Sequence, residues 1–233
     1  MLKIHGFVKN SFADWDGKIV ATIFCFGCNY RCGFCFNPEL VCAEHCSALK
    51  AKNISEKTIL HFLQSRKSFL DGICITGGEP LLQNNLSEFL KKIKKFNFLI
   101  KLDHNGSMPN KLEDLINNKL IDYIAMDIKA PFNRYQKITN SKIQTLTIKK
   151  SIDLIINSGI DHEFRSTILP NLHKKQDILQ MAKMIKNGKR YFLQSFKNAK
   201  TLDPKFKKYK SYTKEQMQKL AKACNKYIKT EYR

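Results

Sequence analysis

Runs of apolar residues typical of buried strands alternate along this chain with segments that have one apolar helical face. The strand-like runs are rich in β-branched residues. They lie at Lys18–Phe24, Gly72–Thr76, Phe98–Asp103, Tyr123–Ile128, Ile160–Ile168 and Arg190–Phe196. Buried strands joined by amphipathic helices are typical of a parallel sheet covered by helices. Six such units predict an α/β fold, namely a partial (β/α)6 TIM-like barrel, with a flat doubly wound sheet as the alternative.

The segments between the strands carry apolar residues on one helical face. One stripe consists of Leu86, Phe89, Leu90 and Ile93. Residues 178–185 have the same i, i+3, i+4, i+7 spacing, and Ile148, Ile152, Ile155 and Ile156 form a similar stripe. Further on we predict a loop at 204–210 and a last helix at 214–229.

The chain shows no internal repeat, low-complexity linker or Pro/Gly-rich boundary. Its 233 residues, of which 43% are hydrophobic, are enough for one full core. We therefore expect a single domain over residues 1–233, with its core at about 4–196 and a basic helical extension at 197–233.

Chemically capable residues lie in the last part of nearly every predicted strand or directly after it. They are Cys25, the Thr76–Pro80 loop, the Asp103–Gly106 loop, Asp127 with Lys129, Arg165 with Thr167, and Gln194 with Ser195. The carboxyl ends of barrel strands meet on one face, where active sites are built. The sequence therefore predicts a site on that face.

Three cysteines stand in the spacing C-x3-C-x2-C, at Cys28, Cys32 and Cys35. Three thiolates so close together can hold three irons of a 4Fe–4S cluster and leave the fourth iron open for a ligand. Zinc is the first alternative, with Cys25 as the fourth thiolate. Zinc ribbons, however, separate their two C-x-x-C halves by roughly 15 to 20 residues. The C-x2-C-x2-C-x3-C-P run of a ferredoxin is not present either, so we predict an iron–sulfur cluster on these three cysteines.

The other cysteines allow several interpretations. Cys25 ends an apolar strand and is interpreted as a partly buried thiol rather than an extra ligand. Cys42 and Cys46 flank a histidine and are either a second metal site or surface thiols. Cys74 and Cys224 lie in apolar patterns and are predicted to be core residues.

The three-cysteine motif together with Gly77-Gly78-Glu79-Pro80 resembles the radical S-adenosylmethionine (SAM) enzymes. Further stretches resemble the branch that activates glycyl-radical enzymes, at 17–23, 37–40, 76–83, 101–106, 122–130 and 158–165. Within that branch the chain most resembles activating proteins of anaerobic ribonucleotide reductases, and more distantly pyruvate formate-lyase activating enzymes. The resemblance covers about residues 4–196.

The resemblance implies a partial (β/α)6 barrel and a defined chemistry. The open iron binds the amino and carboxylate groups of SAM. One electron from a reduced flavodoxin or ferredoxin cleaves SAM to methionine and a 5′-deoxyadenosyl radical. That radical abstracts a hydrogen from a glycine Cα of the partner enzyme, which is expected to be an anaerobic ribonucleotide reductase.

The resemblance also assigns roles to single residues. Gly77 and Gly78 let the backbone approach the methionine part of SAM, and Glu79 lies beside its amino group. Asp103 contacts the amino group as well, and Lys129 reaches the ribose or the carboxylate.

The resemblance suggests further roles, and for Arg165 and the Asp103–Asp127 pair an alternative interpretation stays open. Asn37 contacts SAM. Arg165 binds the carboxylate or the substrate loop, or else forms a structural salt bridge. Asp103 and Asp127 share a monovalent cation, or they are paired surface acids. Phe36 departs from the family pattern, because relatives usually have His there.

The formal net charge is +21, and residues 171–233 contribute +14 of it through 18 basic and 4 acidic side chains. Of the 41 basic residues only six are Arg, whereas nucleic-acid recognition favours Arg. We therefore do not expect a nucleic-acid partner. The basic stretch is either a docking site for an acidic partner or a solvated, solubilising face.

The sequence has no apolar run of the roughly 18 residues that a membrane span requires and no signal-peptide pattern at its N-terminus. We therefore expect a cytoplasmic protein without a membrane partner. Two functional alternatives stay open. One is a radical SAM enzyme with another substrate, such as a pyruvate formate-lyase-type partner, a small molecule or RNA. The other is a non-catalytic zinc or nucleic-acid module.

Overall fold

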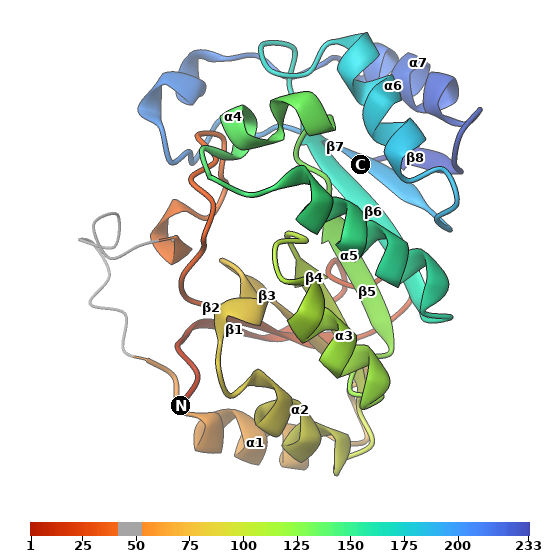
Figure 1. Ribbon diagram of the computed structural model, residues 1–233. Coiled ribbons are helices and arrows are strands. Elements are labelled where there is room, and N and C mark those ends of the chain that lie inside the picture. Colours follow the sequence, from red (N-terminus) through yellow and green to blue (C-terminus); the bar gives the residue numbers. More distant parts are fainter. Residues whose placement is uncertain (42–52) are drawn as a thin grey trace. The chain divides into compact units, whose positions relative to one another are not determined.

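The computed structural model describes residues 1–41 and 53–233 (Figure 1). Along the sheet the strands keep their chain order, from β1 to β8. The strands are β1 (Ile4–Ser11), β2 (Val20–Cys25), β3 (Gly72–Gly77), β4 (Leu99–His104), β5 (Tyr123–Asp127), β6 (Asp161–Ile168), β7 (Tyr191–Ser195) and β8 (Thr230–Tyr232). The α-helices are α1 (Glu56–Ser65), α2 (Leu86–Lys94), α3 (Pro109–Asn117), α4 (Tyr135–Thr139), α5 (Thr145–Asn157), α6 (Lys175–Met184) and α7 (Lys214–Cys224). Short 3-10 helices are η1 (Pro38–Leu40), η3 (Pro80–Leu82), η4 (Phe132–Arg134) and η5 (Pro204–Lys208).

All six predicted strands are present, and their parallel pairing is confirmed for β2 with β3, β3 with β4, and β6 with β7. Two strands were missed. β1 pairs antiparallel with β2 and has only Ile4 fully buried, so it lacks the continuous apolar run of a buried strand. β8 has only three residues and obtains its order from pairing with β7.

The predictions for the end of the chain were partly wrong. The last helix stops at Cys224 instead of continuing to residue 229. It stops because the Asn225 side chain binds both backbone groups of Thr230 and turns the chain into β8. The predicted loop at 204–210 contains η5, whose first backbone N–H groups are capped by Asp203.

The described chain divides into two compact units. The first unit comprises residues 1–29, 39–104 and 110–124, and the second comprises 30–38, 105–109 and 125–233, apart from the undescribed residues. The prediction of a single domain stays a prediction.

Each unit has its own apolar core. In the first unit, the inner residues of β2, β3 and β4 are buried, and Trp15 packs against Tyr123 with ring centroids 5.4 Å apart. In the second unit, Phe164 and Tyr191 are fully buried between the sheet and its helices. The Tyr191 hydroxyl donates to Ser166 Oγ at 2.7 Å, so its polar end is satisfied inside that core.

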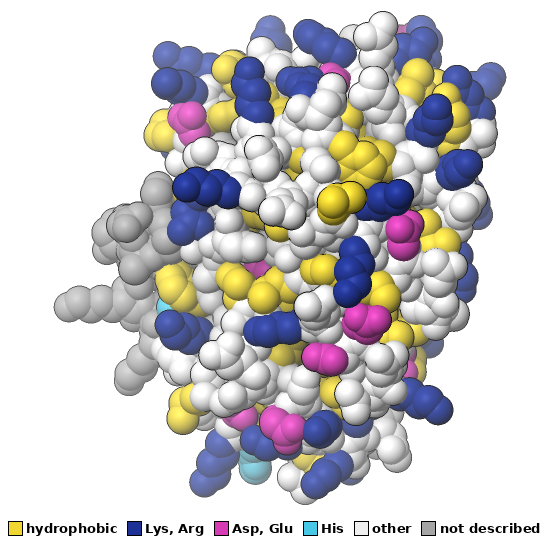
Figure 2. All heavy atoms as spheres, viewed as in Figure 1, with side chains coloured by type: hydrophobic (Ala, Val, Ile, Leu, Met, Phe, Trp, Pro, Cys, Tyr) yellow, Lys and Arg dark blue, Asp and Glu magenta, His cyan; other side chains and the backbone are white. Residues whose placement is uncertain are grey.

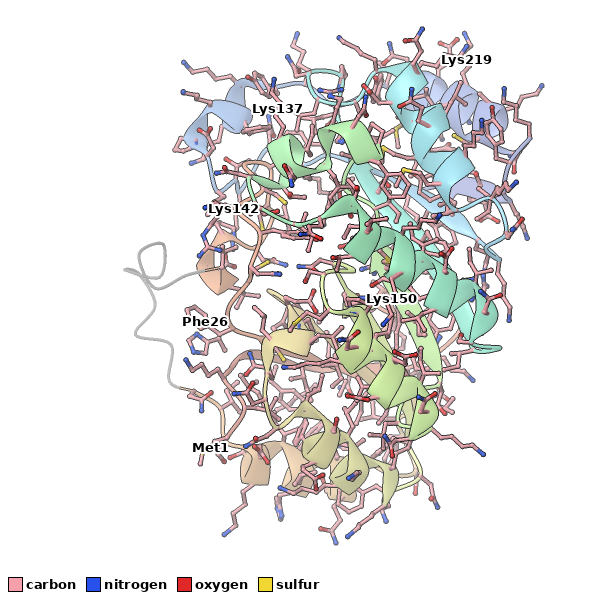
Figure 3. All side chains as sticks on the ribbon, in the orientation of Figure 1. Met1, Phe26, Lys137, Lys142, Lys150 and Lys219 are labelled. Atoms are coloured by element: carbon pink, nitrogen blue, oxygen red, sulfur yellow. The ribbon has the colours of Figure 1, made fainter. Side chains whose placement is uncertain are left out.

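Lysine and arginine side chains are scattered over the face drawn in Figure 2 rather than gathered in one patch. Lys137, Lys150 and Lys219 come from three different helices of the second unit (Figure 3). Of these three lysines only Lys219 belongs to the basic stretch 171–233, so both interpretations of that stretch stay predictions. In the part of the chain that the structure describes, no helix is long and apolar enough to cross a membrane.

Candidate functional site

In the first unit, the loop that carries Cys28 is bound to the loop that follows β3. The Gly78 N–H donates to the Cys25 carbonyl at 2.9 Å, and the Glu79 N–H donates to the Gly27 carbonyl at 2.8 Å. On its other side, the Cys28 N–H donates to the Val41 carbonyl at 3.1 Å. The position of the Cys28 backbone therefore depends on the Gly-Gly-Glu-Pro loop.

The two glycines of that loop are required by close backbone packing. A Cβ on Gly78 would lie 2.2 Å from the Gly27 carbonyl oxygen. Gly77 has a φ of +120°, and a Cβ there would lie 2.4 Å from Cys25 backbone atoms. Close packing against the chain's own backbone therefore explains both glycines. Their approach to SAM stays a proposal.

Glu79 is fully buried, and its Oε1 accepts a hydrogen bond from the Leu81 N–H at 3.0 Å, which caps η3. Burial, with a smaller contribution from the Glu79 charge, raises the pKa of the Cys25 thiol to about 12. Cys25 is therefore protonated near neutral pH and a poor metal ligand. This agrees with the prediction of a buried thiol there.

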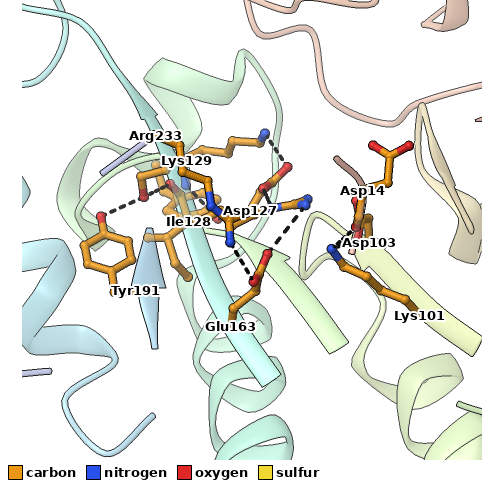
Figure 4. Close-up of polar contacts among 12 residues, drawn as sticks. Asp14, Lys101, Asp103, Asp127, Ile128, Lys129, Glu163, Tyr191 and Arg233 are labelled. Atoms are coloured by element: carbon orange, nitrogen blue, oxygen red, sulfur yellow. Dashed lines mark hydrogen bonds and ion pairs between the residues drawn. The ribbon is translucent and has the colours of Figure 1, made fainter. Parts of the chain in front are cut away.

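Asp103 lies at the carboxyl end of β4 and is 9% exposed. The Lys101 ammonium, itself 3% exposed, lies 3.6 Å from Asp103 Oδ1 and donates to the Asp14 carbonyl (Figure 4). The sequence analysis assigned no role to Lys101, although a lysine inside an otherwise apolar strand was an available signal. Its charge compensates the buried carboxylate of Asp103.

In the second unit, Cys32 and Cys35 belong to one turn, since the Cys35 N–H donates to the Cys32 carbonyl at 3.0 Å. Cys32 is buried and Cys35 is partly exposed. Neighbouring segments hold the turn: the Asp203 N–H donates to the Gly33 carbonyl at 2.9 Å. The Phe206 ring packs so closely that a Cβ on Gly33 would lie 2.5 Å from it.

Asp127, Lys129 and Arg165 form an ion-pair cluster in the second unit (Figure 4). Lys129 Nζ lies 3.0 Å from Asp127 Oδ2, and Arg165 Nε lies 3.0 Å from Asp127 Oδ1. Burial by itself would raise the pKa of Asp127, but Arg165 and Lys129 together hold it well below its usual range. The structural salt bridge predicted as one alternative for Arg165 is therefore present.

The electrostatics of Lys129 connect this cluster to the two cysteines. Burial would lower the pKa of Lys129, but Asp127 and the negative charges of Cys32 and Cys35 raise it above its usual range. Lys129 therefore stays charged and interacts electrostatically with Cys32 and Cys35.

His173 supports both Lys129 and the cysteine turn, and the sequence analysis missed it. It is fully buried. Its Nδ1 accepts from the Leu169 N–H, so its Nε2 carries the proton and donates to the Lys129 carbonyl at 2.9 Å. Its ring packs edge-on against Phe34, with centroids 6.1 Å apart. An isolated histidine in a loop gave no sequence signal for this role.

A pH-dependent loss of stability is expected from His173. Burial lowers its pKa from 6.5 to about 4. Between these values the unfolded chain binds a proton that the native chain does not, so the free energy of unfolding falls as the pH falls from 6.5 towards 4. The loss should be about 3 kcal/mol over this window. In urea unfolding of the metal-free protein at a series of pH values, His173→Gln should reduce this fall in the free energy of unfolding. If the free energy of unfolding of His173→Gln falls with pH as steeply as that of the wild type, His173 is not the source of the pH dependence.

The other residues singled out in the sequence differ in their exposure to solvent. Asn37 is partly exposed, and Phe36 is 49% exposed. Cys74 and Cys224 are buried, as predicted. Cys42 and Cys46 lie outside the described residues.

The structure brings part of the predicted site together within each unit. The first unit joins the Cys28 loop to Gly77, Gly78 and Glu79, and it also carries Asp103. The second unit joins Cys32 and Cys35 to Lys129, Asp127 and Arg165. Asp103 and Asp127 each have a cationic side chain beside them, so the predicted monovalent cation gains no support from charge balance.

A profile of the Radical SAM superfamily matches residues 22–185. The chain therefore belongs to the radical SAM superfamily, as the sequence motifs indicated.

Three named proteins are similar to this chain over two thirds or more of its length. A Methanocaldococcus jannaschii protein named "Putative glycyl-radical enzyme activating enzyme" is 34% identical over 97% of this chain and 92% of its own length. The pyruvate formate-lyase-activating enzyme of Clostridium pasteurianum is 28% identical over 80% of this chain and 77% of its own length. The 7-carboxy-7-deazaguanine synthase of Archaeoglobus fulgidus is 28% identical over 69% of this chain and 68% of its own length.

The fold is also found in solved structures. Streptococcus suis SuiB bound to S-adenosylmethionine matches 89% of this chain with a TM-score of 0.68 at 14% sequence identity. The matched part is 48% of SuiB, so this chain spans about half of that protein. The likeness shows the predicted α/β fold with a partial barrel-like parallel sheet.

Membership in the superfamily implies a 4Fe–4S cluster and SAM. The described residues contain no ready-made group of three or more metal-ligating side chains, so ligation by the three cysteines stays a proposal. The residues nevertheless fit these groups. Thiolates are the usual ligands of iron–sulfur clusters, Cys32 and Cys35 share one turn, and the charged Lys129 acts on both of them.

Proposed function

We propose that this protein is a glycyl-radical enzyme activating enzyme and that its partner is an anaerobic ribonucleotide reductase. The proposal is carried by the likeness to the M. jannaschii protein of that name, which extends over nearly the whole of both chains. The C. pasteurianum relative supports the same class of activity. The choice of a ribonucleotide reductase rests on the motif resemblance, and a cytoplasmic location is part of the proposal.

The proposed site assigns a task to each part of the chain. Cys28, Cys32 and Cys35 would hold the 4Fe–4S cluster. When bound, the cluster supplies an electron, received from a reduced flavodoxin or ferredoxin, for the cleavage of SAM to a 5′-deoxyadenosyl radical. Tight packing of the Gly78 backbone against Gly27 would fix the loop that carries Cys28.

Individual side chains are proposed to orient SAM. Lys129, which stays an ammonium ion because of Asp127 and the thiolates, would bind the ribose or carboxylate oxygens. Asp103, a carboxylate with Lys101 beside it, would accept from the amino group, near which Glu79 is also proposed to lie. Asn37 and Arg165 would complete the contacts.

The test is an electron paramagnetic resonance assay with the reconstituted protein, SAM, a reductant and an anaerobic ribonucleotide reductase. We expect a glycyl-radical doublet on the reductase, and no doublet when its radical glycine is replaced by alanine. A doublet on a pyruvate formate-lyase-type enzyme, without one on the reductase, would keep the activity class and change the partner. No doublet on either enzyme, with SAM cleavage intact, would overturn the proposal.

A radical SAM enzyme that acts on a small molecule is the second candidate. The observation that favours it is the likeness to 7-carboxy-7-deazaguanine synthase, which covers about two thirds of both chains. This candidate requires that a small-molecule substrate raise the rate of 5′-deoxyadenosine formation when no protein partner is present. If only a glycyl-radical enzyme raises that rate, this candidate fails.

A further inference from the structure

Five charged side chains of the second unit form a row of ion pairs with alternating sign (Figure 4). In order they are Arg233, Glu163, Arg165, Asp127 and Lys129. Arg233 Nη2 lies 3.7 Å from Glu163 Oε2, and Arg165 Nη1 lies 3.9 Å from Glu163 Oε1. The other end of the row is Lys129, whose charge acts on Cys32 and Cys35.

Arg233 is held in place from three directions. Its N–H donates to the Leu193 carbonyl at 2.9 Å, and its carbonyl accepts from the Ser195 N–H at 3.0 Å. Its guanidinium lies 3.6 Å from the centroid of the Phe192 ring, which is a cation–π distance. Both the backbone and the side chain of Arg233 therefore have partners within the second unit.

The carboxylate of Glu163 is buried, so its charge depends on the neighbouring arginines. Glu163 is 2% exposed, and a carboxylate at that depth is costly unless cations compensate it. Arg233 supplies part of this compensation, and Arg165 supplies another part. Arg165 is also the partner of Asp127, so Glu163 and Asp127 compete for the same guanidinium.

We propose that Arg233 is a positioning residue for SAM binding, acting through Glu163. By compensating Glu163, it leaves Arg165 on Asp127, and Asp127 in turn holds the Lys129 ammonium in a fixed direction. Without Arg233, Glu163 draws Arg165 away from Asp127, and Lys129 loses its orientation. The inference rests on the proposed contact between Lys129 and SAM.

The test measures the dissociation constant of SAM by equilibrium dialysis, expressed per 4Fe–4S cluster in the anaerobically reconstituted protein. Arg233→Gln should raise this constant about tenfold. Arg233→Lys keeps the charge and should raise it less. The matched control is Arg190→Gln, because Arg190 pairs with Asp161 at 2.6 Å where β6 begins and directly before β7 begins. It should leave the constant within about twofold of the wild-type value.

A double variant separates positioning from simple structural support. Glu163→Gln removes the charge that competes for Arg165, so Glu163→Gln combined with Arg233→Gln should recover most of the affinity that Arg233→Gln loses. A residue that only stabilises the fold would give no such recovery. Replacing such a residue would lower the unfolding temperature and the cluster content but leave the dissociation constant of SAM per cluster unchanged. That result for Arg233→Gln would overturn the inference.

Lys129→Met distinguishes the failure of this inference from the failure of its premise. If Lys129→Met leaves SAM affinity unchanged, the proposed role of Lys129 fails and the inference fails with it. If Lys129→Met weakens binding and Arg233→Gln does not, only the inference fails. Neither result depends on which partner enzyme receives the radical.

Discussion

Replacing Cys32 with alanine is expected to abolish reductive SAM cleavage, with a fall of more than about a thousandfold in the rate of 5′-deoxyadenosine formation. Cys32 is buried in the turn that it shares with Cys35, close to the charged Lys129. Removing one of three proposed thiolate ligands leaves one iron of the cluster without its protein ligand. Chromatography of the product, together with iron and sulfide analysis after anaerobic reconstitution, measures both effects.

Cys224→Ala is the matched control for a lost thiol. Cys224 is fully buried in α7, so its replacement removes a core sulfur and should cost about 1 kcal/mol of stability. Iron content and product formation should stay at wild-type values. If Cys32→Ala retains the cluster, or if the purified protein holds zinc in place of iron, the proposed ligation is wrong.

Gly78→Ala is expected to have the second largest effect. The added Cβ would lie 2.2 Å from the Gly27 carbonyl oxygen and 2.8 Å from that of Leu40. Both are backbone atoms that cannot rotate away, so the loop carrying Cys28 must move. We expect a loss of about 3 kcal/mol in the free energy of unfolding and a reduced iron content after reconstitution. Urea unfolding and iron analysis measure these two effects.

The control for this glycine is Gly159→Ala. Gly159 has a φ of +74°, but no atom lies within 4 Å of a Cβ built there. Its replacement should cost about 1 kcal/mol through backbone strain alone and leave iron content unchanged. Equal iron loss in both variants would show that the Gly78 packing has no special connection with the cysteine loop.

The sequence predicted those parts of the fold that have a local pattern. Strands such as β2 and β3 are buried along their length, so their apolar runs were visible before the structure. β1 and β8 had no such run, because β1 is a partly exposed antiparallel strand and β8 is a three-residue strand that depends on β7. A strand of this kind exists through its partner and cannot be recognised from its own residues.

In the candidate site, too, the sequence indicated some features and the structure added others. The spacing of Cys28, Cys32 and Cys35 indicated an iron–sulfur cluster, and its combination with the Gly77–Gly78 loop resembled the radical SAM enzymes, which implied a SAM-dependent site. The sequence did not indicate that Glu79 caps its own turn or that His173 holds the Lys129 carbonyl.

By itself, the sequence determined the family, the α/β alternation and the identity of the chemically capable residues, since each depends on residues near one another in the chain. Only the tertiary structure decided the charge partners of Asp103, Asp127 and Glu163, among them Lys101, Arg165 and Arg233. The physical reason is that compensation of a buried charge depends on distance in space. Strand pairing brings Glu163 and Arg233 together although 69 residues of chain lie between them.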